Sequence, residues 1–130
     1  MPSRYSDSDR QKALQTFLSI DETISQLLNW NKNINSVENY YSSENGVMLL
    51  TANCTLITAI GEGLNRINRI LPGFLNSTFS EIPWHSYISM RNHIAHGYFE
   101  LDAFLVYDAI VNDFPKLQTI IRNAINLLKE

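Results

Sequence analysis

The sequence predicts an all-α protein, an antiparallel bundle of four or five helices. Apolar residues recur at intervals of three and four along most of the chain, and no stretch shows the alternation of a half-buried strand. Only 5 glycines and 4 prolines occur in the 130 residues, few for an all-β protein that turns often. The length suits one compact unit of roughly 100–150 residues. We therefore expect residues 1–130 to form a single domain.

The first helix is expected from about Asp9 to Trp30. Asp7 or Ser8 can cap its start, because a short side-chain oxygen accepts hydrogen bonds from first-turn amides. The stretch from Asn31 to Asn45 is rich in asparagine, serine and tyrosine and has no apolar period, so a loop is predicted there. The apolar positions of the first helix are Ala13, Phe17, Ile20, Ile24 and Leu27.

The second apolar stripe predicts a central helix that ends at Leu71-Pro72-Gly73. Gly61 and Gly63 lie inside it, where each costs about 1 kcal/mol relative to alanine. Such small residues let another backbone or a ligand approach closely. Cys54, the single cysteine of the sequence, excludes an internal disulfide and is predicted to be an inert core thiol. The stripe comprises Leu50, Cys54, Ile57, Leu64 and Ile67.

Two further helices follow. The third is expected to begin at Pro83 and to end or loosen at Gly97. The fourth has Asp102 as its cap or first residue. Pro115 interrupts it and removes an internal hydrogen bond, so a kink or break is predicted near Asn112–Phe114. Its apolar positions are Val106, Ile110, Phe114, Leu117, Ile121, Ala124 and Leu128.

Charge and hydropathy limit the class of protein. The net charge of −3 argues against coating nucleic acid through charge alone, but it allows a local cationic site. No apolar region follows the N-terminal residues, so no signal peptide is predicted. The longest apolar stretch, Val47 to Ile60, contains polar residues and is shorter than the roughly 20 residues that span a bilayer. We expect a soluble cytoplasmic protein with no membrane partner.

The segment Arg91-Asn92-His93-Ile94-Ala95-His96-Gly97-Tyr98 crowds cationic, amide, imidazole and phenol groups together. A guanidinium can hold a phosphate through two parallel hydrogen bonds, and a histidine with a pKa near roughly 6.5 can move a proton at neutral pH. An arginine and a histidine five residues apart are also common without function, so spacing alone leaves both interpretations open. The two histidines lack the carboxylate spacing of di-iron bundles, and no metal site is predicted.

This segment resembles the signature of the HepT-like toxins of the HEPN superfamily. Their motif is an arginine, four residues, a histidine, any residue and a tyrosine, and Arg91, His96 and Tyr98 fill it. Ile60-Gly61-Glu62 and the stretch from Val111 to Leu117 also resemble the family. The resemblance covers most of the chain from the first helix onward, apart from the predicted loop. It implies that residues 1–130 form a HEPN-type helical bundle.

The resemblance also implies an activity. Such a protein would be a metal-independent endoribonuclease, the toxin of a type II/VII-like toxin–antitoxin system, with tRNA as the substrate that the resemblance suggests. The RNA 2′-hydroxyl attacks the adjacent phosphate, with no cofactor. By the resemblance, His96 is the general acid or base and Arg91 stabilises the phosphorane. Asn92 would orient one of these side chains or the phosphate.

The partners follow from the same resemblance. Family members form homodimers with the motif at a two-fold interface, so that one composite cleft uses both copies of Arg91 and His96. The antitoxin is a minimal nucleotidyltransferase, which transfers AMP to the tyrosine that corresponds to Tyr98 and silences the nuclease. The alternative is a non-catalytic HEPN module that binds a nucleotidyltransferase and helps to bind its nucleotide or substrate. A purely structural helical dimer would leave the polar motif unexplained.

Several other polar residues have two interpretations. Glu62 can pair with Arg91 or with a backbone group, because a buried carboxylate without a partner would be costly. His93 is either an exposed helix residue or a supporting residue of the site. Arg66 and Arg69 either guide RNA or belong to a solvated helix face.

Overall fold

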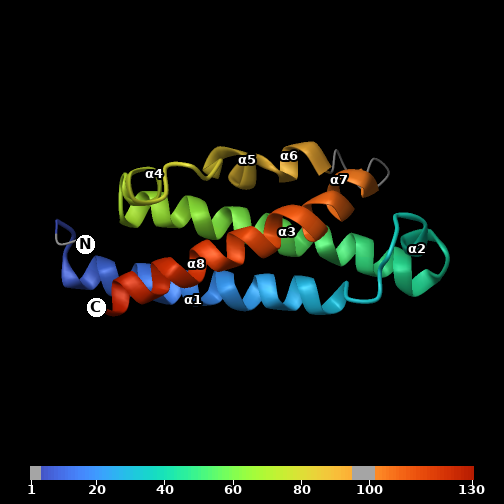
Figure 1. Ribbon diagram of the computed structural model, residues 1–130, viewed down its shortest axis with the longest axis horizontal. Helices are drawn as coiled ribbons and strands as arrows, with labels where there is room; N and C mark the ends of the chain where they lie inside the picture. Colours follow the sequence, from blue (N-terminus) through green and yellow to red (C-terminus); the bar gives the residue numbers. More distant parts are fainter. Residues whose placement is uncertain (1–3, 95–101) are drawn as a thin grey trace.

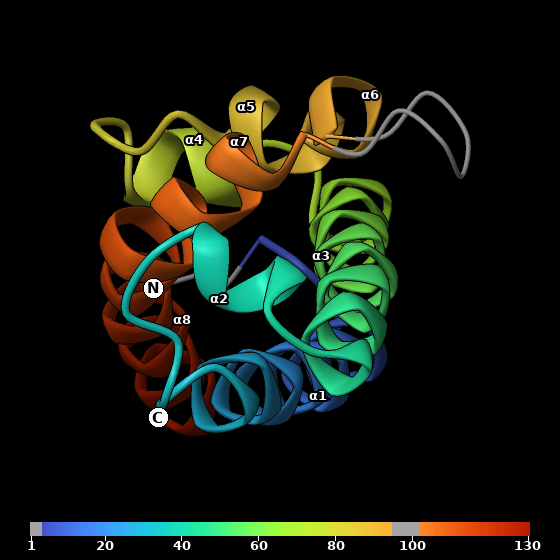
Figure 2. The ribbon, with the colours of Figure 1, turned by 90° about the vertical axis from the view of Figure 1, so that its right-hand side faces the viewer.

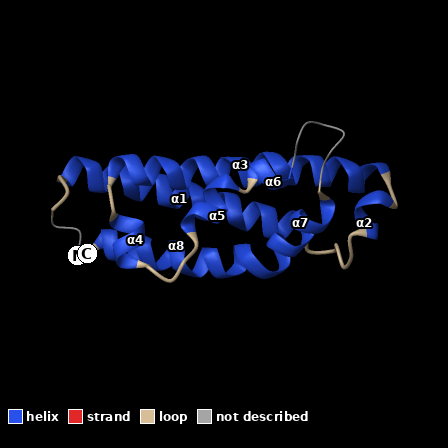
Figure 3. Ribbon diagram, turned by 90° about the horizontal axis from the view of Figure 1, so that it is seen from above, coloured by secondary structure: helices blue, strands red, loops and turns tan. Residues whose placement is uncertain are grey.

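The computed structural model describes residues 4–94 and 102–130, in which helices are joined by turns and no strand occurs (Figure 3). Three long helices lie side by side, and α1 contacts both of the others. Figure 1 shows that α3 and α8 run opposite to α1, so that α1 begins and α8 ends at the same end of the molecule. The predicted all-α antiparallel bundle is confirmed. The three helices are α1 (Asp7–Trp30), α3 (Glu44–Ile70) and α8 (Phe114–Lys129).

Short helices complete the bundle. The short helices other than α2 lie along α3 and α8 and form the fourth side of the bundle (Figure 2). Helix α2 lies at one end of the long helices. One π-helical segment, Ala109–Asp113, joins α7 to α8. The short helices are α2 (Glu38–Tyr41), α4 (Phe74–Thr78), α5 (Trp84–Ser89), α6 (Arg91–Ile94) and α7 (Ala103–Asp108).

Helix α1 buries the five apolar residues that its period predicts. The predicted cap was wrong, because Ser6 caps the helix in place of Asp7 or Ser8. Its backbone is extended, with φ −66° and ψ 156°, and its side-chain oxygen accepts from the Asp9 amide at 3.0 Å. Short oxygen-bearing side chains follow one another here, and the backbone conformation decides which of them caps the helix.

The predicted loop from Asn31 to Asn45 is largely ordered by a buried polar cluster of Asn31, Tyr40 and Asn53. The Asn31 amide donates to Asn53 Oδ1 at 2.8 Å, and the Tyr40 hydroxyl donates to Asn31 Oδ1 at 2.7 Å. Asn53 in turn donates to Asn31 Oδ1 at 2.9 Å. Burial raises the pKa of Tyr40 to about 12. The prediction of a loop was wrong for α2 and for the first turn of α3, because these contacts between distant residues leave no periodic pattern.

Helix α3 is the central helix, and its glycines mark close contacts. A Cβ added at Gly61 would lie 3.0 Å from the carbonyl oxygen of Ile88 and 3.2 Å from that of Tyr87. A Cβ at Gly63 would lie 2.7 Å from Cγ1 of Ile20 on α1. The expectation that small residues allow close approach is confirmed. The predicted stop is confirmed too, since Gly73 has φ 83°, a conformation that favours glycine.

Helix α3 is also long and apolar enough, by length and composition, to cross a membrane, with a mean hydropathy of 1.5 over 18 residues. In the structure it packs against α1, α2 and α5, and its inner side belongs to the hydrophobic core. The central helix of a soluble bundle meets the same criterion. Its outer side is less covered, and Val47 and Met48 are exposed there.

The third predicted helix is in fact two short ones, α5 and α6, which meet at Met90, and the prediction of one continuous helix was wrong. Pro83 precedes α5 as its N-cap residue. The Trp84 indole donates to the carbonyl oxygens of Leu75 and Phe79 at 3.1 and 3.0 Å, which attaches α5 to α4. Gly97, the expected helix end, lies outside the described residues.

The fourth predicted helix contains the kink that its proline predicts. Asp102 caps α7, with its carboxylate accepting from the Leu105 amide at 3.1 Å. The Phe114 amide donates to the carbonyl oxygen of Ala109, one residue further back than in an α-helix. Pro115 follows in the first turn of α8, where its missing N–H costs little.

Candidate functional site

The one-turn helix α6 presents Arg91, Asn92 and His93 to solvent, whereas Ile94 is buried. The amides of His93 and Ile94 both donate to the carbonyl oxygen of Met90, at 2.9 and 3.1 Å, and form the turn. Ile94 anchors the turn in the core, and the side chains of the other three residues are exposed. Three consecutive residues of the predicted site are therefore displayed together.

The position of α6 is set by α5, which precedes it by one residue. Gly61 allows the backbone of α5 to lie directly on α3. On the other side, the Tyr87 hydroxyl donates to the carbonyl oxygen of Asp113 at 2.9 Å. Burial, and the nearby Asp113 charge, raise the pKa of Tyr87 to about 12, so this hydroxyl keeps its proton and remains a donor. The backbone contact with α3 and the Tyr87 hydrogen bond to the π-helical segment thus place α5, and with it Arg91.

Arg91 and Glu62 form an ion pair, the first of the two alternatives predicted for Glu62, with 3.4 Å between Nη1 and Oε1. The reason given for the pairing was wrong, because Glu62 is exposed on the outer side of α3 and is not a buried carboxylate in need of a partner. The two side chains are 55% and 66% exposed, and such exposed pairs contribute about 0–1 kcal/mol. A phosphate group can therefore displace the carboxylate from the guanidinium at little cost.

His96 and Tyr98 lie outside the described residues, and their roles stay predictions. The two described residues on either side of residues 95–101 are in contact, because the Asp102 amide donates to the carbonyl oxygen of Ile94 at 2.8 Å. The structure thus brings together Arg91 and Glu62 at the contact of α6 with α3, and places Asn92 and His93 on the same turn.

A hollow of about 390 Å³, here called the α5–α7 hollow, lies on the other side of α6. Among its polar residues only His93 was a candidate for the site, and His85 was expected to be a surface residue. His85, Ser89 and His93 follow one another at intervals of four residues. This spacing is the feature of the sequence from which the hollow could have been predicted. The pKa of Asp113 is raised by burial and by the charge of Asp108, and Lys116 lowers it in part. The lining residues are His85, Ser86, Ser89, Met90, His93, Ile94, Leu105, Asp108, Ala109 and Asp113.

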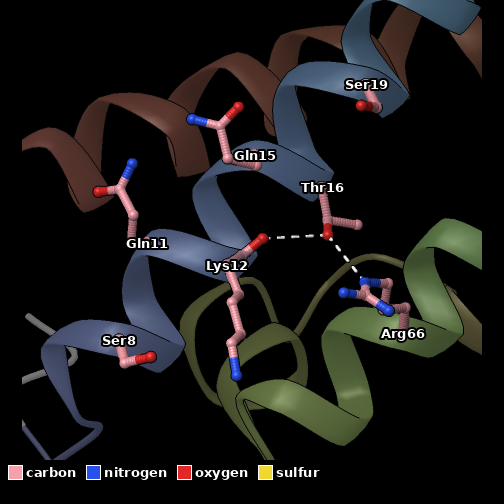
Figure 4. A pocket seen from close by; sticks show the side chains of 7 residues that line it. All are labelled: Ser8, Gln11, Lys12, Gln15, Thr16, Ser19 and Arg66. Carbon is pink, nitrogen blue, oxygen red and sulfur yellow. Dashed lines mark hydrogen bonds between the residues drawn. The ribbon is translucent and has the colours of Figure 1, made fainter.

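A second hollow of about 470 Å³ lies between α1 and α3, and Figure 4 shows Lys12 and Arg66 extending toward it from these helices. Arg66 Nε donates to the Thr16 hydroxyl at 3.2 Å, and that hydroxyl donates to the carbonyl oxygen of Lys12 at 3.1 Å. Arg66 lies one turn after Glu62 on α3. Lys12 was not singled out in the sequence. The other lining residues are Ser8, Gln11, Gln15 and Ser19.

The outer side of α3 has a shallow depression of about 370 Å³ next to Glu62. Cys54 contributes to its wall and packs against the core from its edge, so the prediction of a core thiol is met only in part. The residue is half-buried, and burial raises its pKa. The apolar stripe predicted a fully buried position for Cys54, because the composition of α3 indicates a helix that is packed on more sides than it is in the structure. In residues 4–94 and 102–130, no group of three or more His, Cys, Asp or Glu residues is arranged to hold a metal ion.

The described residues thus form an all-α helical bundle that exposes an Arg-Asn-His turn. Residues 20–124 match the family described as "Ribonuclease HepT-like", and the chain belongs to this family. A protein of Methanocaldococcus jannaschii named "Putative RNase MJ1380" is 26% identical over 109 residues, which cover 83% of this chain and 93% of that protein. None of the solved structures compared with the chain matches it. The family indicates a ribonuclease of the HEPN type.

Proposed function

We propose that this protein is a metal-independent endoribonuclease that acts in the cytoplasm as the toxin of a toxin–antitoxin system. The observation that carries the proposal is the exposed turn of α6, where Arg91 stands at the start of the arginine–histidine–tyrosine motif in a HepT-like bundle. Arginine and histidine can together supply charge stabilisation and proton transfer without a metal ion.

The proposed reaction is a transesterification within the RNA strand. The ribose 2′-oxygen forms a bond to phosphorus while the bond to the 5′-oxygen breaks, which leaves a 2′,3′-cyclic phosphate. His96 takes the 2′-proton or protonates the leaving 5′-oxygen. Arg91 exchanges Glu62 for the phosphate and stabilises the charge on its oxygens. Asn92, next to Arg91 on the exposed turn, orients the phosphate or one of the two catalytic side chains.

Expression with and without a neighbouring nucleotidyltransferase tests this function, with growth and RNA integrity followed together. Growth arrest with RNA cleavage, relieved by the partner, is the expected result. Normal growth and intact RNA would favour the alternative, a non-catalytic module that binds the nucleotidyltransferase.

A homodimer is expected, because two copies of Arg91 would concentrate positive charge on a chain with a net charge of −3. The exposed Val47 and Met48 and the shallow depression beside Glu62 make the outer side of α3, next to α6, a suitable contact surface. Sedimentation velocity at micromolar concentration should show a dimer. A monomer that retains nuclease activity would contradict the composite cleft.

Tyr98→Phe should prevent silencing by AMP transfer and leave the nuclease active. The variant keeps the ring but lacks the acceptor oxygen, whereas AMP on the wild-type phenol adds negative charge where the RNA phosphate binds. Co-expression with the nucleotidyltransferase, followed by intact-mass spectrometry, should show added AMP on the parent protein and none on the variant. An unmodified parent that is nevertheless neutralised would mean that complex formation inhibits the enzyme.

Lys12→Ala and Arg66→Ala are each expected to weaken RNA binding about equally for all sequences. Each removes one cation from the hollow between α1 and α3, and the slope of log Kd against log salt concentration should fall by about 1. Fluorescence anisotropy with a 2′-O-methyl RNA, which cannot be cleaved, measures both quantities. Lys32→Ala, an exposed lysine after α1, is the control and should leave the slope unchanged. Equal slopes in all variants would exclude the hollow from the RNA path.

A further inference from the structure

We propose that the α5–α7 hollow binds the base of the nucleotide next to the cleaved phosphate, and that it selects a base with an exocyclic amino group over uracil. The inference deepens the proposed ribonuclease function and rests on it for the identity of the ligand. Its evidence is the composition of the hollow, its position next to Arg91, and the way in which its walls are fixed.

The composition of the hollow suits a base. Its apolar lining, from Met90, Ile94 and Leu105, can contact the flat face of an aromatic ring. Two exposed imidazoles, of His85 and His93, stand at the same hollow, and histidine is one of the side chains on which unpaired RNA bases stack. The volume of about 390 Å³ gives room for one such group.

The charge of the hollow determines which part of the RNA can enter. Asp108 and Asp113 line it, and carboxylates repel phosphate but accept hydrogen bonds from amino groups. Guanine, adenine and cytosine carry such an amino group, whereas uracil presents two carbonyl oxygens and one N–H. Asp108 Oδ1 already accepts from the Asn112 amide at 2.8 Å, and its second oxygen can accept from the base. The hollow is therefore suited to an amino-bearing base edge and unsuited to the backbone.

The position of the hollow joins it to the proposed catalytic arginine. Arg91 and His93 are two residues apart on α6, about 200° around the helix axis. Arg91 faces Glu62 on α3, and His93 faces the hollow. An RNA strand that crosses the exposed turn at Asn92 can thus place its phosphate on one side of α6 and the neighbouring base on the other.

The walls of the hollow are held before any ligand binds. The bond from the Tyr87 hydroxyl to the carbonyl oxygen of Asp113 joins α5 to the π-helical segment. The buried Ile94 and Ala109 fix the adjoining parts of α6 and of that segment. Specificity that rests on a preformed pocket should appear already in the binding of small nucleotides.

The binding experiment uses GMP, AMP, CMP and UMP as probes with the full chain. The imidazole NMR signals of His85 and His93 report on occupancy of the hollow. The three amino-bearing nucleotides should shift both signals and bind roughly tenfold more tightly than UMP, the range of discrimination that a base contact gives. Equal affinity for UMP, or signals that move with none of the four, would overturn the proposal.

The matched variants are the double variant Asp108→Asn, Asp113→Asn and the control Glu22→Gln, which removes an exposed carboxylate on α1. Asparagine keeps the shape but turns one acceptor into a donor, so the double variant should lose the roughly tenfold preference and gain affinity for UMP. The control should keep the preference. The variant should fold, because Asp113 is a carboxylate whose pKa burial raises, and the neutral amide removes that cost. An unchanged preference in the double variant would overturn the proposal.

Cleavage separates this inference from the proposed function. RNAs that differ only in the base beside one cleavable phosphate should show the same order of preference in kcat/KM, and the double variant should lose it. Selective binding of the mononucleotides without any RNA cleavage would refute the ribonuclease and retain a base-binding hollow. Cleavage without base preference, in the parent protein and in the double variant alike, would retain the ribonuclease and refute the hollow.

Discussion

His96→Ala should abolish RNA cleavage, with a loss of about 10²–10⁴-fold in kcat, because the variant lacks the proposed general acid or base. Arg91→Ala should be similarly damaging, because it removes the guanidinium that is proposed to stabilise the charge on the phosphate oxygens. Single-turnover cleavage of a labelled RNA gives the rate, and circular dichroism should show unchanged helicity. Toxicity on expression should disappear in parallel.

Two controls make this result specific. Arg122→Ala removes an exposed arginine from α8, where it pairs with Asp21 at 3.0 Å, and should leave cleavage intact. EDTA should have little effect on the parent enzyme, because arginine and histidine are proposed to supply the chemistry. Activity that disappears with EDTA and returns with a divalent ion would contradict the mechanism, as would an active His96→Ala protein.

Asn53→Ala is expected to lower the free energy of unfolding by about 1–3 kcal/mol. Asn53 is 0% exposed, and it exchanges hydrogen bonds with Asn31 and donates to the Tyr40 hydroxyl at 3.2 Å. Alanine would leave the Asn31 amide with an unpaired hydrogen in the core and would open a cavity beside it. Urea denaturation followed by circular dichroism measures the change.

Asn65→Ala provides the matched comparison, because Asn65 lies on the same helix and is exposed. Its effect should stay within about 0.5 kcal/mol, as for most surface substitutions. Tyr40→Phe keeps the buried ring and removes only the hydroxyl, so it should destabilise the protein as well. Equal stability of the Asn53 and Asn65 variants would show that the buried polar cluster does not hold α2 to the bundle.

The long helices could be predicted from the sequence because their apolar period is itself the cause of their packing. Each buried position of α1 follows from spacings of three and four. The kink before α8 could be predicted from Pro115, since a missing N–H acts locally. For the site, the exposed position of His93 was one of two interpretations that its helix offered. The pairing of Glu62 with Arg91 was one of two alternatives, and it was reached from a burial of Glu62 that the structure does not have.

The remaining features depend on contacts between distant residues. The division of the third predicted helix at Met90 accompanies attachments at Trp84 and Gly61, which no local period records. The α5–α7 hollow takes six of its lining residues from residues 85–94 and four from residues 105–113, two segments that lie apart in the sequence. No motif in the sequence marks Asp108 and Asp113 as site residues. The folded chain places them in the same hollow as His85.

The contact at Gly61 has a consequence for how this protein tolerates mutation over evolutionary time. Helix α3 meets α5 there through the carbonyl oxygens of Tyr87 and Ile88, which every amino acid possesses. Substitutions among aliphatic residues elsewhere in the core can therefore accumulate while the distance between α5 and α3 stays constant. A larger residue in place of Gly61 would increase that distance directly. We expect homologous proteins to vary widely in the hydrophobic core and to keep a glycine at this one position.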